Sequence, residues 1–191
     1  MTNKISVKAE TTSYSYVTLH NAAYYELQAA QETEKGRFFH CLSAMLYSAF
    51  SIEAYLNHLG KAEISDWGKI ERRFSPRRKL NMLIETKKYL PDFTKPPFDT
   101  FDRIFDFRKK IVHGKTERIR VEEVREGKLG DTPDLPTSDW EKSTTLENAT
   151  LFYENSTSMI VLLHPIFGCT ENCFSTEWIS SWEVKSLGDI A

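Results

Sequence analysis

The stretch that decides the fold is residues 37–60, RFFHCLSAMLYSAFSIEAYLNHLG. Its apolar side chains recur every three or four positions, a spacing that places them on one face of an α-helix. The face comprises Phe39, Leu42, Leu46, Ala49, Phe50 and Leu56. We therefore expect a helix from Arg37 to about His58 that buries this face and closes at Gly60.

Helical patterns also flank this stretch on both sides. They lie at residues 18–35, 76–90, 98–113 and about 140–164. Ser75 followed by Pro76 is typical of an N-cap and a first helical residue, and Pro91 is a stop signal. The pattern predicts an all-α fold, a bundle of four to five helices in one domain.

The organisation of the chain follows from its length and composition. A chain of 191 residues suits one domain with a real core. We expect an N-terminal arm (residues 1–17) and a single helical domain (residues 18–191). A long, acidic, turn-rich loop (residues 115–139) interrupts that domain, and loops of this length are often functional or mobile. We expect the C-terminal tail (residues 166–191) to pack back on the bundle.

Composition excludes several classes of protein. Hydrophobic residues make up 40% and charged residues 27%, an ordinary globular mixture. No apolar run approaches the roughly 18 residues of a membrane-spanning helix, and no apolar segment of a secretory signal follows the polar N-terminus. Three cysteines are an odd number for a disulfide framework. The expectation is a soluble, cytoplasmic protein without a membrane partner.

The net charge of −2 hides an asymmetry along the chain. Residues 1–115 carry 19 Lys and Arg against 13 Asp and Glu, whereas residues 116–191 carry 6 against 14. The basic part includes a dense cluster between positions 69 and 79 that could attract a polyanion such as RNA. Its candidate RNA contacts are Arg72, Arg73, Arg77, Arg78 and Lys79. The alternative is an ordinary solvated helix face.

Two polar residues interrupt apolar helix faces. Glu53 falls among the apolar side chains of its helix, with Asn57 one turn later, and a carboxylate there should be paired because burying it alone is costly. Arg108 falls in the middle of the aromatic face of helix 98–113. An interior arginine with unpaired donors is a candidate anion site. The structural alternative is an Arg108–Glu53 ion pair inside the bundle.

His113 follows Arg108 by five positions, which is about 140° around a regular helix. The two side chains share a face only if the helix ends there, as Gly114 suggests, or if a second protomer contributes. A lone histidine at a helix end is more often a capping or surface group than a catalyst. Its ordinary pKa near neutrality nevertheless suits histidine to proton transfer.

The segment from Arg108 to His113, followed by Gly114, resembles the Arg-x4–6-His signature of the HEPN family (higher eukaryotes and prokaryotes nucleotide-binding domains). Residues 50–57 are similar to the second helix of that family, in which a Glu and an Asn recur. The order of the two segments also matches. The resemblance covers roughly residues 18–165.

The resemblance implies a metal-independent endoribonuclease whose active site lies at a homodimer interface. Arg108 would bind the scissile phosphate, His113 would act as general base or acid, and the neighbouring 2′-hydroxyl would attack. Glu53, Asn57 and Lys109 would support them. Such proteins act as toxins or anti-phage effectors, often beside a nucleotidyltransferase antitoxin.

An alternative within the same family is a catalytically inert helical dimer that binds RNA or a protein partner. Lys109 favours it, because active members usually have a small polar residue or histidine after the arginine. No cofactor is expected, since the chain has no glycine-rich phosphate loop and no metalloprotease motif. Cys169, Cys173 and His164 could offer three zinc ligands, but two packed thiols are the simpler interpretation.

Overall fold

Seven α-helices and one two-stranded ribbon make up the part of the chain that the computed structural model describes, residues 5–120, 122, 126, 135–174 and 180–186. The mostly α-helical prediction is confirmed. The longer helices are α1 (Ser15–Glu32), α2 (Arg37–Glu63), α4 (Pro76–Thr86), α5 (Phe101–Val112) and α7 (Leu146–Ile166). The short ones are α3 (Trp67–Ile70), α6 (Asp139–Ser143) and a 3-10 turn, η1 (Phe98–Thr100). None of these helices is both long and apolar enough to cross a membrane.

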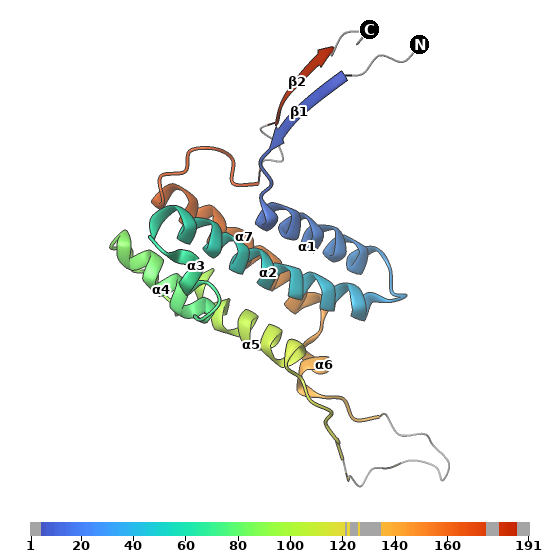
Figure 1. Ribbon diagram of the computed structural model, residues 1–191. Coiled ribbons are helices and arrows are strands. Elements are labelled where there is room, and N and C mark those ends of the chain that lie inside the picture. The colour runs from blue at the N-terminus through green and yellow to red at the C-terminus, as the bar shows by residue number, and fades with distance from the viewer. Residues whose placement is uncertain (1–4, 121, 123–125, 127–134, 175–179, 187–191) are drawn as a thin grey trace, which may run out of the picture.

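Helix α2 is the centre of the bundle, with contacts to α1, α7, α4 and α5 (Figure 1). Its most buried face differs from the expected one, because Phe39 is 68% exposed and Leu42, Leu46 and Phe50 are half-buried. Ala49 and Leu56 are buried as expected, and further buried side chains of α2 lie outside the expected face: Cys41, Ala44, Met45, Ser48, Ile52, Tyr55 and Leu59. Several of these are small, so neighbouring helices can approach α2 closely.

The ends of α2 and α4 depend on local contacts. Gly60 does not end α2, which continues to Glu63. A Cβ atom at Gly60 would lie 2.2 Å from the Trp67 indole, so this glycine allows α3 to pack against α2 rather than capping a helix. The Ser75 side chain accepts a hydrogen bond from the backbone N–H of Arg78 at the start of α4, as the N-cap prediction requires.

The aromatic face of η1 and α5 is covered by the same chain. Phe98, Phe101 and Phe105 are 4%, 1% and 9% exposed. The turn η1 contacts α7, and α5 contacts α2 and α4. These phenylalanines therefore need no second protomer to cover them, which removes one argument for a homodimer.

The two ends of the described chain pair with each other. Strand β1 (Ile5–Thr11) is antiparallel to β2 (Ser180–Ser186), with Ile5 opposite Ser186 and Thr11 opposite Ser180. The ribbon projects from one end of the bundle (Figure 1). Part of the expected arm (residues 5–11) thus pairs with part of the expected tail (residues 180–186), which does not pack on the bundle as predicted. The start of the tail does, since Phe167, Cys169, Cys173 and Phe174 pack in or against the core.

The acidic loop (residues 115–139) leaves the opposite end of the bundle (Figure 1). Its described positions form neither helix nor strand until α6 begins at Asp139. The remaining positions of this loop, 121, 123–125 and 127–134, lie outside the described residues.

Candidate anion-binding cleft

A cleft of about 720 Å³ opens where the segment before α4 faces α5. Arg108 and His113 both line it, together with Glu53 from α2. The backbone explains how residues 140° apart on a wheel share one cleft, because α5 ends at Val112 and His113 caps it, with its N–H donating to the Lys109 carbonyl over 3.0 Å. Because the helical turn stops before His113, this residue and Arg108 can line the same cleft.

Glu53 lies between two cations at the back of this cleft. Its Oε2 is 2.9 Å from Nη2 of Arg108, and its Oε1 is 3.0 Å from Nζ of Lys79. Lys79 is 1% exposed, whereas the side chains of Glu53 and Arg108 are about one-fifth exposed. Glu53 is half-buried and paired, as expected. The Arg108–Glu53 ion pair, given above as the structural alternative to an anion site, is present.

Arg108 keeps donors for a further anion. The ion pair with Glu53 uses one of the five N–H donors of a guanidinium. Its Nε is buried and has no hydrogen-bond partner among the described residues. One carboxylate between two cations leaves a net positive charge of one at this site. Because Glu53 is shared between Arg108 and Lys79, an anion that enters the cleft would meet a guanidinium that is oriented and only partly neutralised.

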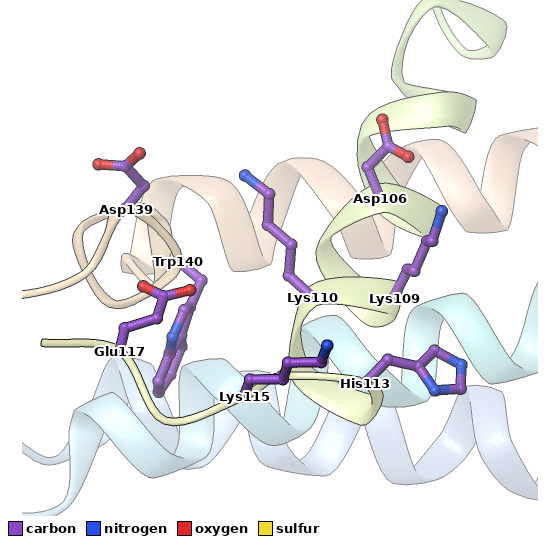
Figure 2. A pocket seen from close by; sticks show the side chains of 9 residues that line it. Asp106, Lys109, Lys110, His113, Lys115, Glu117, Asp139 and Trp140 are labelled. Atoms are coloured by element: carbon purple, nitrogen blue, oxygen red, sulfur yellow. The ribbon is translucent and has the colours of Figure 1, made fainter.

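His113 stands at the junction of two hollows. It is exposed, and its side chain has no hydrogen bond or ion pair within the described part of the chain. With Asp106 and Lys109 it also lines a second hollow, of about 790 Å³, at the end of α5 (Figure 2). The histidine is free to contact a molecule in either hollow.

The basic cluster divides into exposed and structural members. Arg72 and Arg73 are exposed, line the cleft and have no acidic partner among the described residues. Arg78 is exposed but lies outside the lining, with its guanidinium 3.8 Å from the centre of the Phe74 ring. Among these three exposed arginines, only Arg72 and Arg73 therefore face the cleft.

The other two members of the cluster, Arg77 and Lys79, make contacts within the bundle. Arg77 lines the cleft but pairs with Asp102 over 3.1 Å and lies 3.5 Å from the centre of the Phe93 ring. Lys79, expected as a surface RNA contact, is buried against Glu53. That expectation is corrected, because an ammonium with 1% exposure cannot reach a nucleic acid without unfolding its surroundings.

Asn57 does not reach the cleft. It lines a separate hollow of about 590 Å³ with Tyr14, His58 and Trp67, and its buried Oδ1 has no hydrogen-bond partner among the described residues. Burial, with a smaller contribution from His164, lowers the pKa of His58. The supporting role expected of Asn57 beside Arg108 is not supported by this position.

The sulfur atoms near the end of α7 show no sign of a metal centre. Burial raises the pKa of the Cys169 and Cys173 thiols, which disfavours the thiolate that zinc requires. Nδ1 of His164 is within 3.1 Å of the Tyr55 hydroxyl. Within the described residues, no group of three His, Cys, Asp or Glu is placed to hold a metal ion.

Six residues of the second hollow were not singled out as functional from the sequence: Asp106, Lys110, Lys115, Glu117, Asp139 and Trp140. Trp140 is separated from His113 by 26 intervening positions, and no local pattern links the two. Only the return of the chain to the end of α5 brings Trp140 into the same hollow as His113.

Comparison with known proteins finds no match for this chain, whether among family models, curated proteins or solved structures.

Proposed function

We propose that this chain is a HEPN-type, metal-independent endoribonuclease, with the HEPN-like helical bundle as its scaffold and Arg108 and His113 as its catalytic residues. The observation that carries the proposal is that both residues line one cleft, beside free Arg72, Arg73 and Lys109. A cluster of unpaired cations around a proton-transfer group suits a phosphodiester better than a neutral substrate.

The chemistry is transesterification within the RNA. A general base removes the proton of a 2′-hydroxyl, and the oxygen attacks the adjacent phosphorus. The bond from phosphorus to the 5′-oxygen breaks, and that oxygen takes a proton from a general acid. The products are a 2′,3′-cyclic phosphate and a free 5′-hydroxyl. Arg108 meets the charge that develops on the phosphoryl oxygens, and His113 carries the proton.

One histidine per chain makes a second copy useful, since the reaction needs both a base and an acid. We therefore include a homodimer in the proposal, with His113 of each protomer facing a shared site. Val112, adjacent to His113, is 52% exposed, as an apolar residue at a subunit contact would be in an isolated protomer. An RNA-targeting toxin or anti-phage effector is the biological role, with a nucleotidyltransferase antitoxin as the expected class of protein partner.

The second candidate is a catalytically inert dimer that binds RNA or a protein partner. The Glu53–Arg108 ion pair favours it, because a guanidinium already held by a carboxylate has less charge to offer a transition state. Lys109 also follows the arginine where active relatives of the resembled family carry a smaller residue or histidine.

Cleavage of end-labelled RNA by the full chain tests the two candidates. We expect cutting in EDTA, products that end in 2′,3′-cyclic phosphate, and no cutting of DNA of the same sequence, which lacks the nucleophile. Arg108→Ala and His113→Ala should each abolish cleavage. Salt-sensitive RNA binding without cleavage would favour the inert dimer.

Matched controls come from outside the cleft. Arg103 lies on the same helix as Arg108 but contacts Asn148 away from the cleft, so Arg103→Ala should cut normally. His40, in the first turns of α2, pairs with Glu26 of α1 and does not line the cleft. His40→Gln should therefore cut normally. Activity that survives the Arg108/His113 double substitution would show that the site assignment is wrong.

A further inference from the structure

The second hollow, which shares His113 with the Arg108 cleft, has two walls. Figure 2 shows Lys109, Lys110, His113 and the carboxylate of Asp106 on the α5 side, with Trp140, Glu117 and Asp139 opposite them. The two hollows share Asp106, Lys109 and His113. A polymer that passes His113 in the first cleft therefore continues into the second hollow.

The indole of Trp140 is held in place by the start of α6. Ser138 and Glu141 form a reciprocal cap there, with 2.7 Å between the Ser138 nitrogen and Oε2 of Glu141. The Trp140 carbonyl accepts hydrogen bonds from the hydroxyls of Ser143 and Thr144, and its ring packs 6.3 Å from that of Phe38. The remainder of the half-buried indole lines the hollow as a rigid aromatic surface.

The hollow is lined by groups of both charges. Lys110 and Lys115 are exposed ammonium groups without partners among the described residues, and they suit the phosphate. The carboxylates of Glu117 and Asp139 lie on the side of the indole and repel phosphate, but they accept hydrogen bonds from a base edge. Asp139 has only a surface contact with Lys142, at 4.0 Å.

We infer that this hollow is a base subsite for one unpaired nucleotide of single-stranded RNA, with Trp140 as its stacking platform and guanine as its preferred base. The inference rests on the proposed function for the identity of the polymer. Guanine presents adjacent N1–H and N2–H donors on its Watson–Crick edge, which a carboxylate accepts together. Adenine and cytosine each place an acceptor beside their single amino group. An unpaired strand leaves this edge free.

Fluorescence anisotropy with the full-length His113→Ala protein tests the subsite without cleavage. The probes are fluorescein-labelled U12 and two 12-mers of uridine with one central guanosine or one central adenosine. We expect the guanosine probe to bind about fivefold more tightly than the adenosine probe. Adding Trp140→Ala should weaken all three by about fivefold or more, and Trp140→Phe should restore most of that loss.

The carboxylates are tested separately from the indole. Glu117→Gln with Asp139→Asn should remove the guanosine preference without lowering the affinity for U12, because neutral amides no longer favour two adjacent donors. Tyr25, an aromatic residue of α1 that is 68% exposed and lines neither hollow, supplies the control, and Tyr25→Ala should bind like the parent. Unchanged binding in Trp140→Ala overturns the inference, as does a guanosine preference that survives the amide substitutions.

The inference and the proposed nuclease fail in different ways. Binding that depends on Trp140 and favours guanosine, by a protein that never cuts RNA, upholds the subsite and rejects the nuclease. Cleavage that depends on Arg108 and His113, by a protein whose RNA binding and cleavage are unaffected by Trp140→Ala, upholds the nuclease and rejects the subsite.

Discussion

Arg108 is held by Glu53, with 2.9 Å between its Nη2 and the Oε2 of the carboxylate, and the other carboxylate oxygen of Glu53 is bound to buried Lys79. The ion pair orients the guanidinium of Arg108, a residue that lines the cleft. It also makes the candidate site part of the packing between α2, α4 and α5. Stability and anion binding are therefore coupled at Glu53.

Glu53→Ala should lower the free energy of unfolding by about 1–3 kcal/mol, because it leaves the Lys79 ammonium buried without a partner. Urea unfolding measures the change. The double variant Glu53→Ala/Lys79→Met should lose less than the sum of the single variants, since the buried charge is then removed. Glu85→Ala, at an exposed site on α4, is the control and should change stability by no more than about 0.5 kcal/mol.

Replacing Arg72 and Arg73 together by alanine should weaken RNA binding and flatten its salt dependence. Both are exposed in the cleft without acidic partners in the described chain, so each can neutralise one phosphate. The slope of log affinity against log salt should fall in magnitude by about 1.4, which is about 0.7 per contact on a single strand. Lys69→Ala is the control, because that lysine pairs with Asp66 outside the cleft. An unchanged slope in the double variant would remove these arginines from the interface.

The protein should be a homodimer at tens of micromolar, as measured by light scattering. Val112→Asp should shift it toward the monomer, because a carboxylate would replace an exposed apolar side chain next to His113. Leu90 is 92% exposed in the loop after α4, and Leu90→Asp should leave the dimer intact. A strict monomer in the unsubstituted chain would count against a composite active site.

Gly60→Ala should destabilise the fold by about 1–3 kcal/mol, although alanine is the better helix former. The new methyl group would lie 2.2 Å from the Trp67 indole, so the indole or α3 must move. Thermal or urea unfolding gives the size of the effect. The neighbouring Gly68→Ala is a matched control, since nothing lies within 4 Å of its added Cβ.

Lowering the pH from 7.5 to 5 should reduce the stability in part through His20. This histidine is 6% exposed, and burial lowers its pKa below the ordinary value. The unfolded chain then binds a proton that the folded chain excludes. The contribution of His20 is complete above its unfolded pKa and is lost as the pH falls through that value toward the folded pKa. In urea titrations, His20→Gln should show a smaller loss over this range than the unsubstituted protein, and an equal loss would contradict the prediction.

The sequence by itself determined the local features of this protein. Helix positions follow from apolar spacing, and Ser75 caps α4 as expected, because both signals depend on residues within about one helical turn. The half-buried, paired state of Glu53 also follows from an apolar face that contains one charged residue. The helix positions and the cap need no knowledge of which distant segments meet, whereas the Arg108–Glu53 pairing was one of two alternatives until α2 and α5 were placed side by side.

Tertiary structure decided what depends on the packing of distant segments. Helices surround α2, so its most buried face is the one with small side chains rather than the one with Phe39 and Leu42. Lys79 belongs to a basic run, yet its neighbour Glu53 comes from another helix and draws it inside. Trp140 and His113 line one hollow only because the chain returns to the end of α5. Burial is a property of the assembled bundle, since a side chain is removed from water by whatever lies across from it.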